Sequence, residues 1–239
     1  MFCVLVILLQ YLKKLWIRLL RLYLDTADPV HWQNLMPTGA FYGITTNPLL
    51  TKRLGLNYDE IVWEEMISKA AKLGAKEFHV QIYGDATHAL SFAEHLYALG
   101  RSSDIECVIK IPLTFEGISL APKIKEFGAK ILMTACYEPK QMITACALKA
   151  DYVAPYVGRM MDAGLDAMAN MKIIEKIARK NRCIPIIASL RNANQILDIA
   201  EIGHDCFTIS PDVARDLFGS KLTDAAAIAF ETATNGSKV

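Results

Sequence analysis

Position 110 carries a lysine inside an apolar run. Lys110 follows Cys107-Val-Ile109 and precedes Ile111-Pro. An unpaired charge in such a segment is costly, and removal from water lowers the pKa of an amine. A neutral amine attacks a ketone to form an imine, which then withdraws electrons from a neighbouring carbon–carbon bond. Lys110 is therefore a candidate Schiff-base residue. The alternative is a structural lysine whose charged end extends to solvent at the end of the strand, or pairs with Asp25 or Glu106.

Four further residues have side chains that suit proton transfer around an imine. Asp25 can orient Lys110 or carry a proton, or it can cap the first helix. Tyr156 can donate and accept one proton, or it can pack as an aromatic residue at the rim. Gln81 and Thr134 can hold a water or a hydroxyl group. Their alternative role is ordinary hydrogen bonding at the end of a strand.

A second group of residues is suited to binding an anion. Arg159, Ser189 and Arg191 follow the predicted sixth and seventh strands, near the usual phosphate position of α/β barrels. Arginine binds phosphate through two parallel hydrogen bonds. These residues predict a phosphate site, and the alternative is a salt bridge to a loop carboxylate such as Asp162.

Eight short strand-like runs alternate with helical stretches along the chain. The predicted strands are 22–25, 41–45, 77–82, 106–111, 130–134, 151–155, 184–189 and 206–209. The predicted helices are 58–73, 85–100, 115–128, 138–149, 165–181, 192–202 and 211–218, with an additional helix over 221–234. This order predicts a single closed (β/α)8 barrel. The competing layout is a doubly wound open sheet, but no GxGxxG turn follows the first strand, where Asp28 and Pro29 instead mark a helix start.

The barrel layout explains why these polar residues belong together. Strand residues alternate between faces, and the active site of a barrel lies at the carboxyl ends of its strands. Thr45 and Asn47 end the second strand, where Asn47 can bind a substrate hydroxyl or shape the turn before Pro48. With the residues above, seven consecutive strands each bring a polar group to one rim.

Composition excludes several other classes of function. The 239 residues carry 26 basic and 25 acidic side chains, so the net charge of +1 provides no basic surface for nucleic acid. The six cysteines have no CxxC spacing, and the five histidines form no HExxH pattern. We therefore expect no metal, no cofactor, a small-molecule substrate and a reducing, cytoplasmic location.

Residues 1–21 form an apolar and basic extension before the predicted barrel domain, 22–239. The apolar run comes before the basic residues, unlike a secretory signal, and it is too short to span a bilayer. A basic amphipathic helix over 10–21 could contact a membrane surface. The alternatives are a packed terminal helix or a start codon assigned too far upstream.

Five segments resemble the family of small transaldolases and fructose-6-phosphate aldolases. The similarity runs in register from about residue 22 to about residue 233. The matching segments are Leu22-Tyr-Leu-Asp-Thr-Ala-Asp28, Gly43-Ile-Thr-Thr-Asn-Pro48, Val108-Ile-Lys-Ile-Pro112, Tyr152-Val-Ala-Pro-Tyr-Val-Gly-Arg159 and Ala188-Ser-Leu-Arg191.

The resemblance implies a barrel in which Lys110 forms the Schiff base. The family's other site positions fall on Asp25, Thr45, Asn47, Gln81, Thr134, Tyr156, Arg159 and Ser189, with a basic residue often found at Arg191. The family also forms ring-like homo-oligomers, in which the C-terminal helix reaches a neighbouring subunit. The N-terminal extension departs from the family pattern, as does Tyr83-Gly84 after Gln81, which could alter the width of the pocket.

Two positions separate the branches of this family. Transaldolases typically have glutamate at the position of Gln81, and the small ones often have phenylalanine at the position of Tyr156. The pair found here resembles the aldolase branch, which cleaves and forms fructose 6-phosphate from dihydroxyacetone and glyceraldehyde 3-phosphate. The alternative activity is transfer of a dihydroxyacetone unit between sugar phosphates, as in the pentose phosphate pathway. A third interpretation is a non-enzymatic barrel that binds a sugar phosphate or associates with a membrane.

Overall fold

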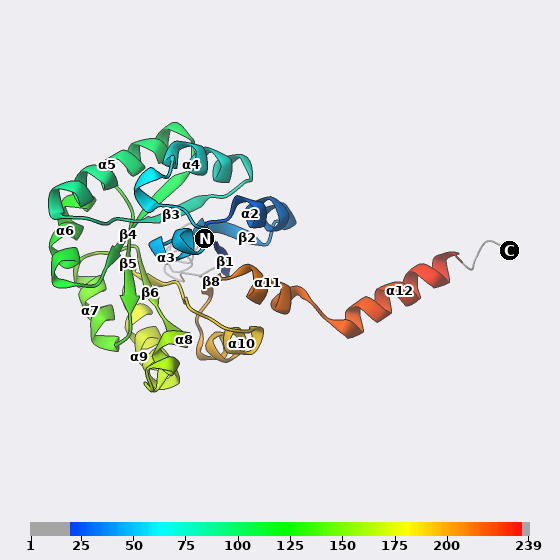
Figure 1. Ribbon diagram of the computed structural model, residues 1–239. Coiled ribbons are helices and arrows are strands. Elements are labelled where there is room, and N and C mark those ends of the chain that lie inside the picture. The colour runs from blue at the N-terminus through cyan, green and yellow to red at the C-terminus, as the bar shows by residue number, and fades with distance from the viewer. Residues whose placement is uncertain (1–19, 236–239) are drawn as a thin grey trace, which may run out of the picture.

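In the computed structural model, which describes residues 20–235, eight parallel strands surround a barrel axis (Figure 1). The strands are β1 (Arg21–Asp25), β2 (Phe41–Thr45), β3 (Glu77–Gln81), β4 (Glu106–Pro112), β5 (Ile131–Cys136), β6 (Tyr152–Pro155), β7 (Ile184–Pro185) and β8 (Cys206–Ile209). Their spatial order is β7-β6-β5-β4-β3-β2-β1-β8, and a bridge between Ile187 and Phe207 joins the two ends. The predicted (β/α)8 barrel is confirmed.

Helices follow the strands and cover the outside of the barrel (Figure 1). They are α2 (Pro29–Leu35), α3 (Pro48–Arg53), α4 (Trp63–Lys72), α5 (Ala86–Ser102), α6 (Phe115–Glu126), α7 (Pro139–Ala147), α8 (Val157–Asp162), α9 (Ala167–Ala178), α10 (Ala193–Ile202), α11 (Pro211–Phe218) and α12 (Lys221–Asn235). Asp28 caps α2 through the backbone N–H of Val30, at 2.8 Å, and Pro29 follows it. The predicted start of the first helix is therefore confirmed, and it is Asp28 that caps it.

Several predicted boundaries differ from those in the structure. The helix expected over 58–73 begins only at Trp63, because Tyr58–Glu60 forms a 3-10 turn. The short helices α3 and α8 were not predicted. The strand expected over 184–189 is regular only at Ile184–Pro185, although Ile186 N–H still donates to Val153 O at 2.8 Å. Proline lacks the N–H that a regular ladder needs, which shortens β7.

Two layers of buried side chains stabilise the barrel. The larger one lies between strands and helices, and the smaller one fills the barrel interior with Tyr23, Val108, Leu132, Tyr152 and Ile186, among others. The two layers arise because successive strand residues point to opposite faces. The interior is thus a packed core with polar groups at either end.

The end of the barrel opposite the rim is closed by a buried carboxylate, Glu77 of β3. Glu77 accepts hydrogen bonds from the phenols of Tyr23 and Tyr152, both at 2.8 Å, and contacts His79 Nε2 at 3.0 Å and Lys130 Nζ at 3.2 Å. These donors lower the pKa of Glu77 to about 2 against the opposing effect of burial, which is the largest single influence. Glu77 therefore stays ionised and fixes four elements around itself.

Helix α12 leaves the barrel and extends into solvent (Figure 1). Its apolar side chains Leu222, Ile228 and Phe230 are 85%, 68% and 70% exposed in the single chain.

None of the helices within residues 20–235 is long and apolar enough to cross a membrane. The predictions for the N-terminal extension fall almost entirely on residues 1–19, which lie outside the described part of the chain.

Candidate active site

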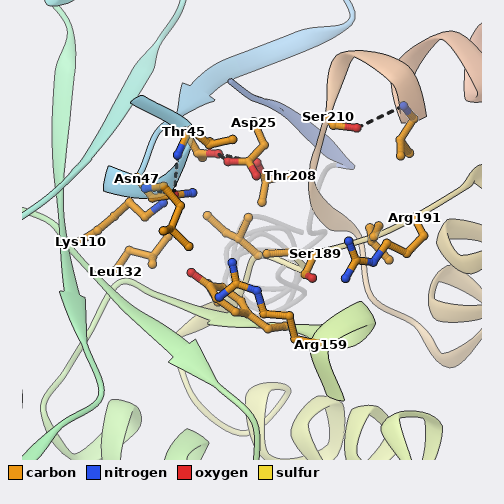
Figure 2. A pocket seen from close by; sticks show the side chains of 18 of the residues that line it. Asp25, Thr45, Asn47, Lys110, Leu132, Arg159, Ser189, Arg191, Thr208 and Ser210 are labelled. Carbon is orange, nitrogen blue, oxygen red and sulfur yellow. Dashed lines mark hydrogen bonds between the residues drawn. The ribbon is translucent and has the colours of Figure 1, made fainter. Parts of the chain in front are cut away.

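A cavity of about 630 Å³ opens at the carboxyl ends of the strands (Figure 2). Eight of the ten predicted site residues line it: Asp25, Thr45, Asn47, Lys110, Tyr156, Arg159, Ser189 and Arg191. Gln81 and Thr134 lie on neighbouring strands but are not part of the cavity wall. The polar residues that strand alternation places at one end of the barrel therefore lie around a single pocket.

Lys110 projects from β4 into the base of this cavity and is only 5% exposed. Its Nζ donates a hydrogen bond to the backbone carbonyl of Thr46 at 2.5 Å. Burial lowers the pKa of Lys110 to about 8, while the negative charge of Asp25 acts in the opposite direction. About a tenth of such amines are neutral at pH 7, far more than for an ordinary lysine. Lys110 is therefore equipped to act as a nucleophile.

Asp25 is held by a chain of hydroxyl groups (Figure 2). Thr45 Oγ1 donates to Asp25 Oδ1 at 2.6 Å, and Thr208 Oγ1 lies 2.6 Å from Thr45 Oγ1. Because Thr45 has one hydroxyl proton and gives it to Asp25, Thr208 must donate to Thr45. The carboxylate is thereby oriented at the wall of the cavity, and Asp28 rather than Asp25 caps α2.

Tyr156 and Thr134 form a hydroxyl pair across β5 and the end of β6, with 2.8 Å between their oxygens. Burial raises the pKa of Tyr156, while the hydrogen bond with Thr134 and the charge of Arg159 partly oppose this. The phenol therefore stays protonated at neutral pH. Tyr156 also packs edge-on against Tyr137. Its ring therefore packs as an aromatic residue at the rim while its side chain lines the cavity.

Gln81 lies beside Lys110 in the strand register but does not reach the cavity wall. Its backbone carbonyl accepts a hydrogen bond from the phenol of Tyr58 at 2.7 Å, which fixes this end of β3. Its predicted role in holding a water stays a prediction.

The residues of the predicted phosphate site line the same cavity, and Ser189 and Arg191 lie across the view from Lys110 in Figure 2. The guanidinium of Arg159 lies 4.7 Å from the ring centre of Tyr156, and no carboxylate within residues 20–235 pairs with it. Arg191 Nη2, in contrast, contacts Asp162 Oδ2 at 2.6 Å. The salt bridge that the sequence left as an alternative is therefore present for Arg191, whereas Arg159 has no such partner among residues 20–235.

A close backbone contact positions this side of the cavity. Gly158 N–H donates to Ser189 O at 2.9 Å, and a Cβ added at Gly158 would lie only 2.1 Å from that oxygen. Ser189 itself has a φ of 61°, in the left-handed region that few non-glycine residues adopt. Strain of this kind persists where surrounding contacts hold it, and it often marks functional sites.

Several site features were missed or left open by the sequence analysis. Asn47 caps α3 by accepting the N–H groups of Leu49 and Leu50, so it shapes the turn while also lining the cavity. Thr208 was overlooked, although the same alternation that selects the other strand ends selects it on β8. The backbone carbonyl of Thr46, which accepts the hydrogen bond from Lys110, could not be predicted, because every residue has such a carbonyl. No group of three His, Cys, Asp or Glu side chains suited to a metal occurs in the described chain.

The sequence profile of the Transaldolase/Fructose-6-phosphate aldolase family matches residues 22–238, which include all of the barrel except Arg21, the first residue of β1. The chain belongs to this family. It is 32% identical to a "Probable transaldolase" of Coprothermobacter proteolyticus over 207 residues, which is 86% of this chain and 92% of that protein. A "Probable transaldolase" of Anaeromyxobacter dehalogenans is 29% identical over 208 residues, with the same coverage. Membership of the transaldolase family makes the protein an enzyme of the transaldolase or aldolase type.

The similarity to solved structures shows only the fold of this chain. Thiamine phosphate pyrophosphorylase from Pyrococcus furiosus superimposes with a TM-score of 0.56 at 15% identity, over 83% of this chain and 90% of that one. At this identity the likeness identifies the barrel and carries no statement about chemistry. The assignment to the transaldolase family rests on the sequence relatives.

Proposed function

We propose that the protein is a Schiff-base aldolase that cleaves and forms fructose 6-phosphate. The observation that carries this proposal is Lys110, a buried lysine with a pKa of about 8 in a cavity at the barrel rim. A neutral amine at this position can add to the ketone of a sugar and lose water to give an iminium ion. Its positive charge accepts the electron pair released when the bond between the α and β carbons of the sugar breaks, which leaves an enamine on Lys110.

Proton transfer in this reaction is assigned to Tyr156, supported by Thr134. Cleavage releases a proton from the hydroxyl at the broken bond, and the enamine carbon left on Lys110 must later gain one. A phenol that keeps its proton at neutral pH and lies on the cavity wall suits this exchange. The carboxylate of Asp25, which lines the same cavity as Lys110, stabilises the iminium charge.

Substrate binding is assigned to the opposite side of the cavity. Arg159 has no carboxylate partner in the described chain and therefore suits the phosphate of glyceraldehyde 3-phosphate. Ser189 and Arg191 line the same side, and Thr45 and Asn47 line the cavity near Lys110, where the sugar hydroxyls would lie. The substrate is thus a sugar phosphate or a small keto sugar. The proposed reaction requires no metal and no cofactor. The enzyme is proposed to act in the cytoplasm.

Transaldolase activity is the second candidate. The relatives named above are each called a probable transaldolase, which favours transfer of a dihydroxyacetone unit. Gln81 and Tyr156 favour the aldolase, because an amide cannot exchange a proton as a carboxylate does. With an amide at Gln81, the acid–base group must be found elsewhere, and Tyr156 is placed to supply it.

Borohydride trapping tests the common step of both activities. Reduction in the presence of dihydroxyacetone or fructose 6-phosphate should add the mass of the bound fragment to Lys110. Lys110→Ala should abolish the adduct, whereas Lys123→Ala, which removes an exposed lysine of α6, should leave it intact. An adduct that survives in Lys110→Ala would refute the assignment.

Parallel assays distinguish the two activities. Cleavage of fructose 6-phosphate should exceed transfer to erythrose 4-phosphate, and Tyr156→Phe should reduce cleavage by roughly 10²- to 10⁴-fold, the usual contribution of acid–base catalysis. Imine trapping at Lys110 should be less affected. Faster transfer than cleavage, or unchanged cleavage in Tyr156→Phe, would favour the transaldolase.

A further inference from the structure

Two cysteines outside the cavity lie together at the opposite end of the barrel. Cys146 is near the C-terminal end of α7, and Cys183 directly precedes β7. Ile184 N–H donates to Asp151 O at 2.9 Å, and Ala150 N–H donates to Ala145 O at 3.0 Å. These backbone bonds bring the start of β7 beside the end of α7. Both cysteines belong to the apolar layer between strands and helices.

The two thiols differ in accessibility. Cys183 is 2% exposed, whereas Cys146 is half-buried and packs against the edge of the same layer. An oxidant dissolved in water can therefore reach the thiol of Cys146 more easily than that of Cys183. The other described cysteines are all fully buried, which makes Cys146 the accessible thiol of residues 20–235.

The two thiols are close enough to interact, with Cys183 as the hydrogen donor. Their interaction lowers the pKa of Cys146 and raises that of Cys183. Burial instead raises the pKa of Cys136 to about 12 and also raises that of Cys107. A thiolate is the reactive form of cysteine, so the pair combines an activated thiol with a neighbouring thiol that still holds its proton.

We propose that Cys146 and Cys183 form a reversible disulfide in response to a peroxide. The Cys146 thiolate attacks hydrogen peroxide, forming a sulfur–oxygen bond as the oxygen–oxygen bond breaks, which yields a sulfenic acid after the departing hydroxide is protonated elsewhere. The Cys183 sulfur then attacks the Cys146 sulfur, and water leaves with the Cys183 proton. Overall, two thiols lose two electrons and two protons, and one peroxide becomes two waters.

The bridge would connect elements that are distant in the sequence. It would close a loop with 36 residues between the two cysteines and tie α7 to the start of β7. Such a bond restricts the unfolded chain more than the folded one, so the oxidised protein should melt at a higher temperature than the reduced protein. Because the pair lies at the end of the barrel opposite Lys110, replacement of either cysteine should leave the activity of the reduced enzyme unchanged.

Peptide mapping tests this proposal in a Cys3→Ser background, which removes the cysteine outside the described residues. Trypsin places Cys146 in the peptide 141–149 and Cys183 in the peptide 183–191, each without another cysteine. Peroxide followed by alkylation should give these two peptides joined and lighter by two hydrogen atoms, and a thiol reductant should separate them. Cys146→Ser and Cys183→Ser should each abolish the product, whereas Cys136→Ser should retain it.

Alkylation rates give an independent measurement. In the reduced protein, iodoacetamide should label Cys146 at least about tenfold faster than Cys183. Cys183→Ala should slow labelling of Cys146 at neutral pH, while Cys183→Ser, which keeps a hydroxyl donor, should slow it less. Oxidation of Cys146 to a sulfinic acid without the joined peptides, bridging to another cysteine, or equal labelling rates would overturn the proposal.

Discussion

Burial and one nearby carboxylate set the reactivity of Lys110. The surrounding apolar strands lower its pKa to about 8, and Asp25 opposes this shift. The balance matters because imine formation needs the neutral amine, whereas the iminium that follows benefits from a nearby negative charge. In the proposed mechanism, Asp25 therefore costs some nucleophilicity and stabilises the charged intermediate.

The first prediction concerns the pH dependence of imine formation. The rate of borohydride trapping should rise with pH and level off above about 8, since the neutral amine accumulates as the pH passes the pKa. Asp25→Asn removes the charge that raises this pKa, so the rise should move to lower pH even if overall activity falls. A rise that continues toward pH 10, or a shift to higher pH in Asp25→Asn, would contradict this account.

The second prediction separates Arg159 from Arg191, the two arginines of the predicted phosphate site. Arg159→Ala should raise KM for glyceraldehyde 3-phosphate about tenfold to a hundredfold, because a charge-assisted hydrogen bond contributes roughly 1.5–3 kcal/mol. Arg191→Ala should have a smaller effect, since Arg191 already pairs with Asp162. Unphosphorylated glyceraldehyde is the control substrate, and an equal loss on both substrates would indicate a structural role for Arg159.

At the scale of secondary structure, Glu77 links strands that are far apart in the sequence. Its carboxylate joins β1, β3 and β6 through two tyrosines and His79, and Lys130 at the start of β5 completes the contacts. His79 Nε2 donates to the ionised Glu77, and its Nδ1 has no hydrogen-bond partner among residues 20–235. The barrel end opposite the cavity therefore depends on one charge.

The third prediction is that Glu77→Gln destabilises the fold by about 3–5 kcal/mol, the usual cost of removing one member of a buried ion pair. Because folding lowers the pKa of Glu77 from 4.5 to about 2, its stabilisation is fully present above pH 4.5 and is lost as the pH falls toward 2. The difference in unfolding free energy between wild type and variant should shrink over this range in urea titrations.

Glu106→Gln is the matched control for that measurement. Glu106 contacts the same Lys130 at 3.2 Å but is partly exposed, and exposed pairs contribute about 0–1 kcal/mol. Equal destabilisation by the two variants, or a pH-independent effect of Glu77→Gln, would show that the buried charge is not the source of stability.

At the scale of the whole molecule, α12 is the element that a single barrel leaves without a partner. It projects from α11 into solvent with Leu222, Ile228 and Phe230 exposed (Figure 1). Burial of such side chains contributes about 1.5–3 kcal/mol each. We propose that α12 packs on a second copy of the chain, as the family resemblance implies, and that the enzyme is a homo-oligomer.

The fourth prediction is that Ile228→Asp combined with Phe230→Asp reduces the oligomer to smaller species. The two charges would be placed in an apolar contact, which light scattering after size exclusion should detect as a lower mass. Asp224→Asn with Glu231→Gln changes the charge of the same helix by the same amount on the side away from Leu222 and Phe230, and serves as the control. A monomeric wild-type protein, or an unchanged mass in the first variant, would refute this role of α12.

The barrel and the polar residues at the ends of its strands could be predicted from local patterns in the sequence. Strand alternation has a period of two, so the polar residue that ends each apolar run must point into the barrel, as Lys110, Asp25 and Thr45 do. Helix starts such as Asp28-Pro29 depend on neighbouring residues and could be predicted for the same reason. These features are local, and local chemistry is visible in a sequence.

The contacts between these residues, in contrast, depend on how the whole chain folds. The Thr208–Thr45–Asp25 chain joins positions up to 183 residues apart, and Arg191 rather than Arg159 pairs with Asp162. Gln81 lies next to Lys110 in the register and still does not line the cavity, while Ser189 adopts a left-handed conformation held by Gly158. Distances of this kind follow from how eight strands close around one axis, and no spacing along the chain encodes them.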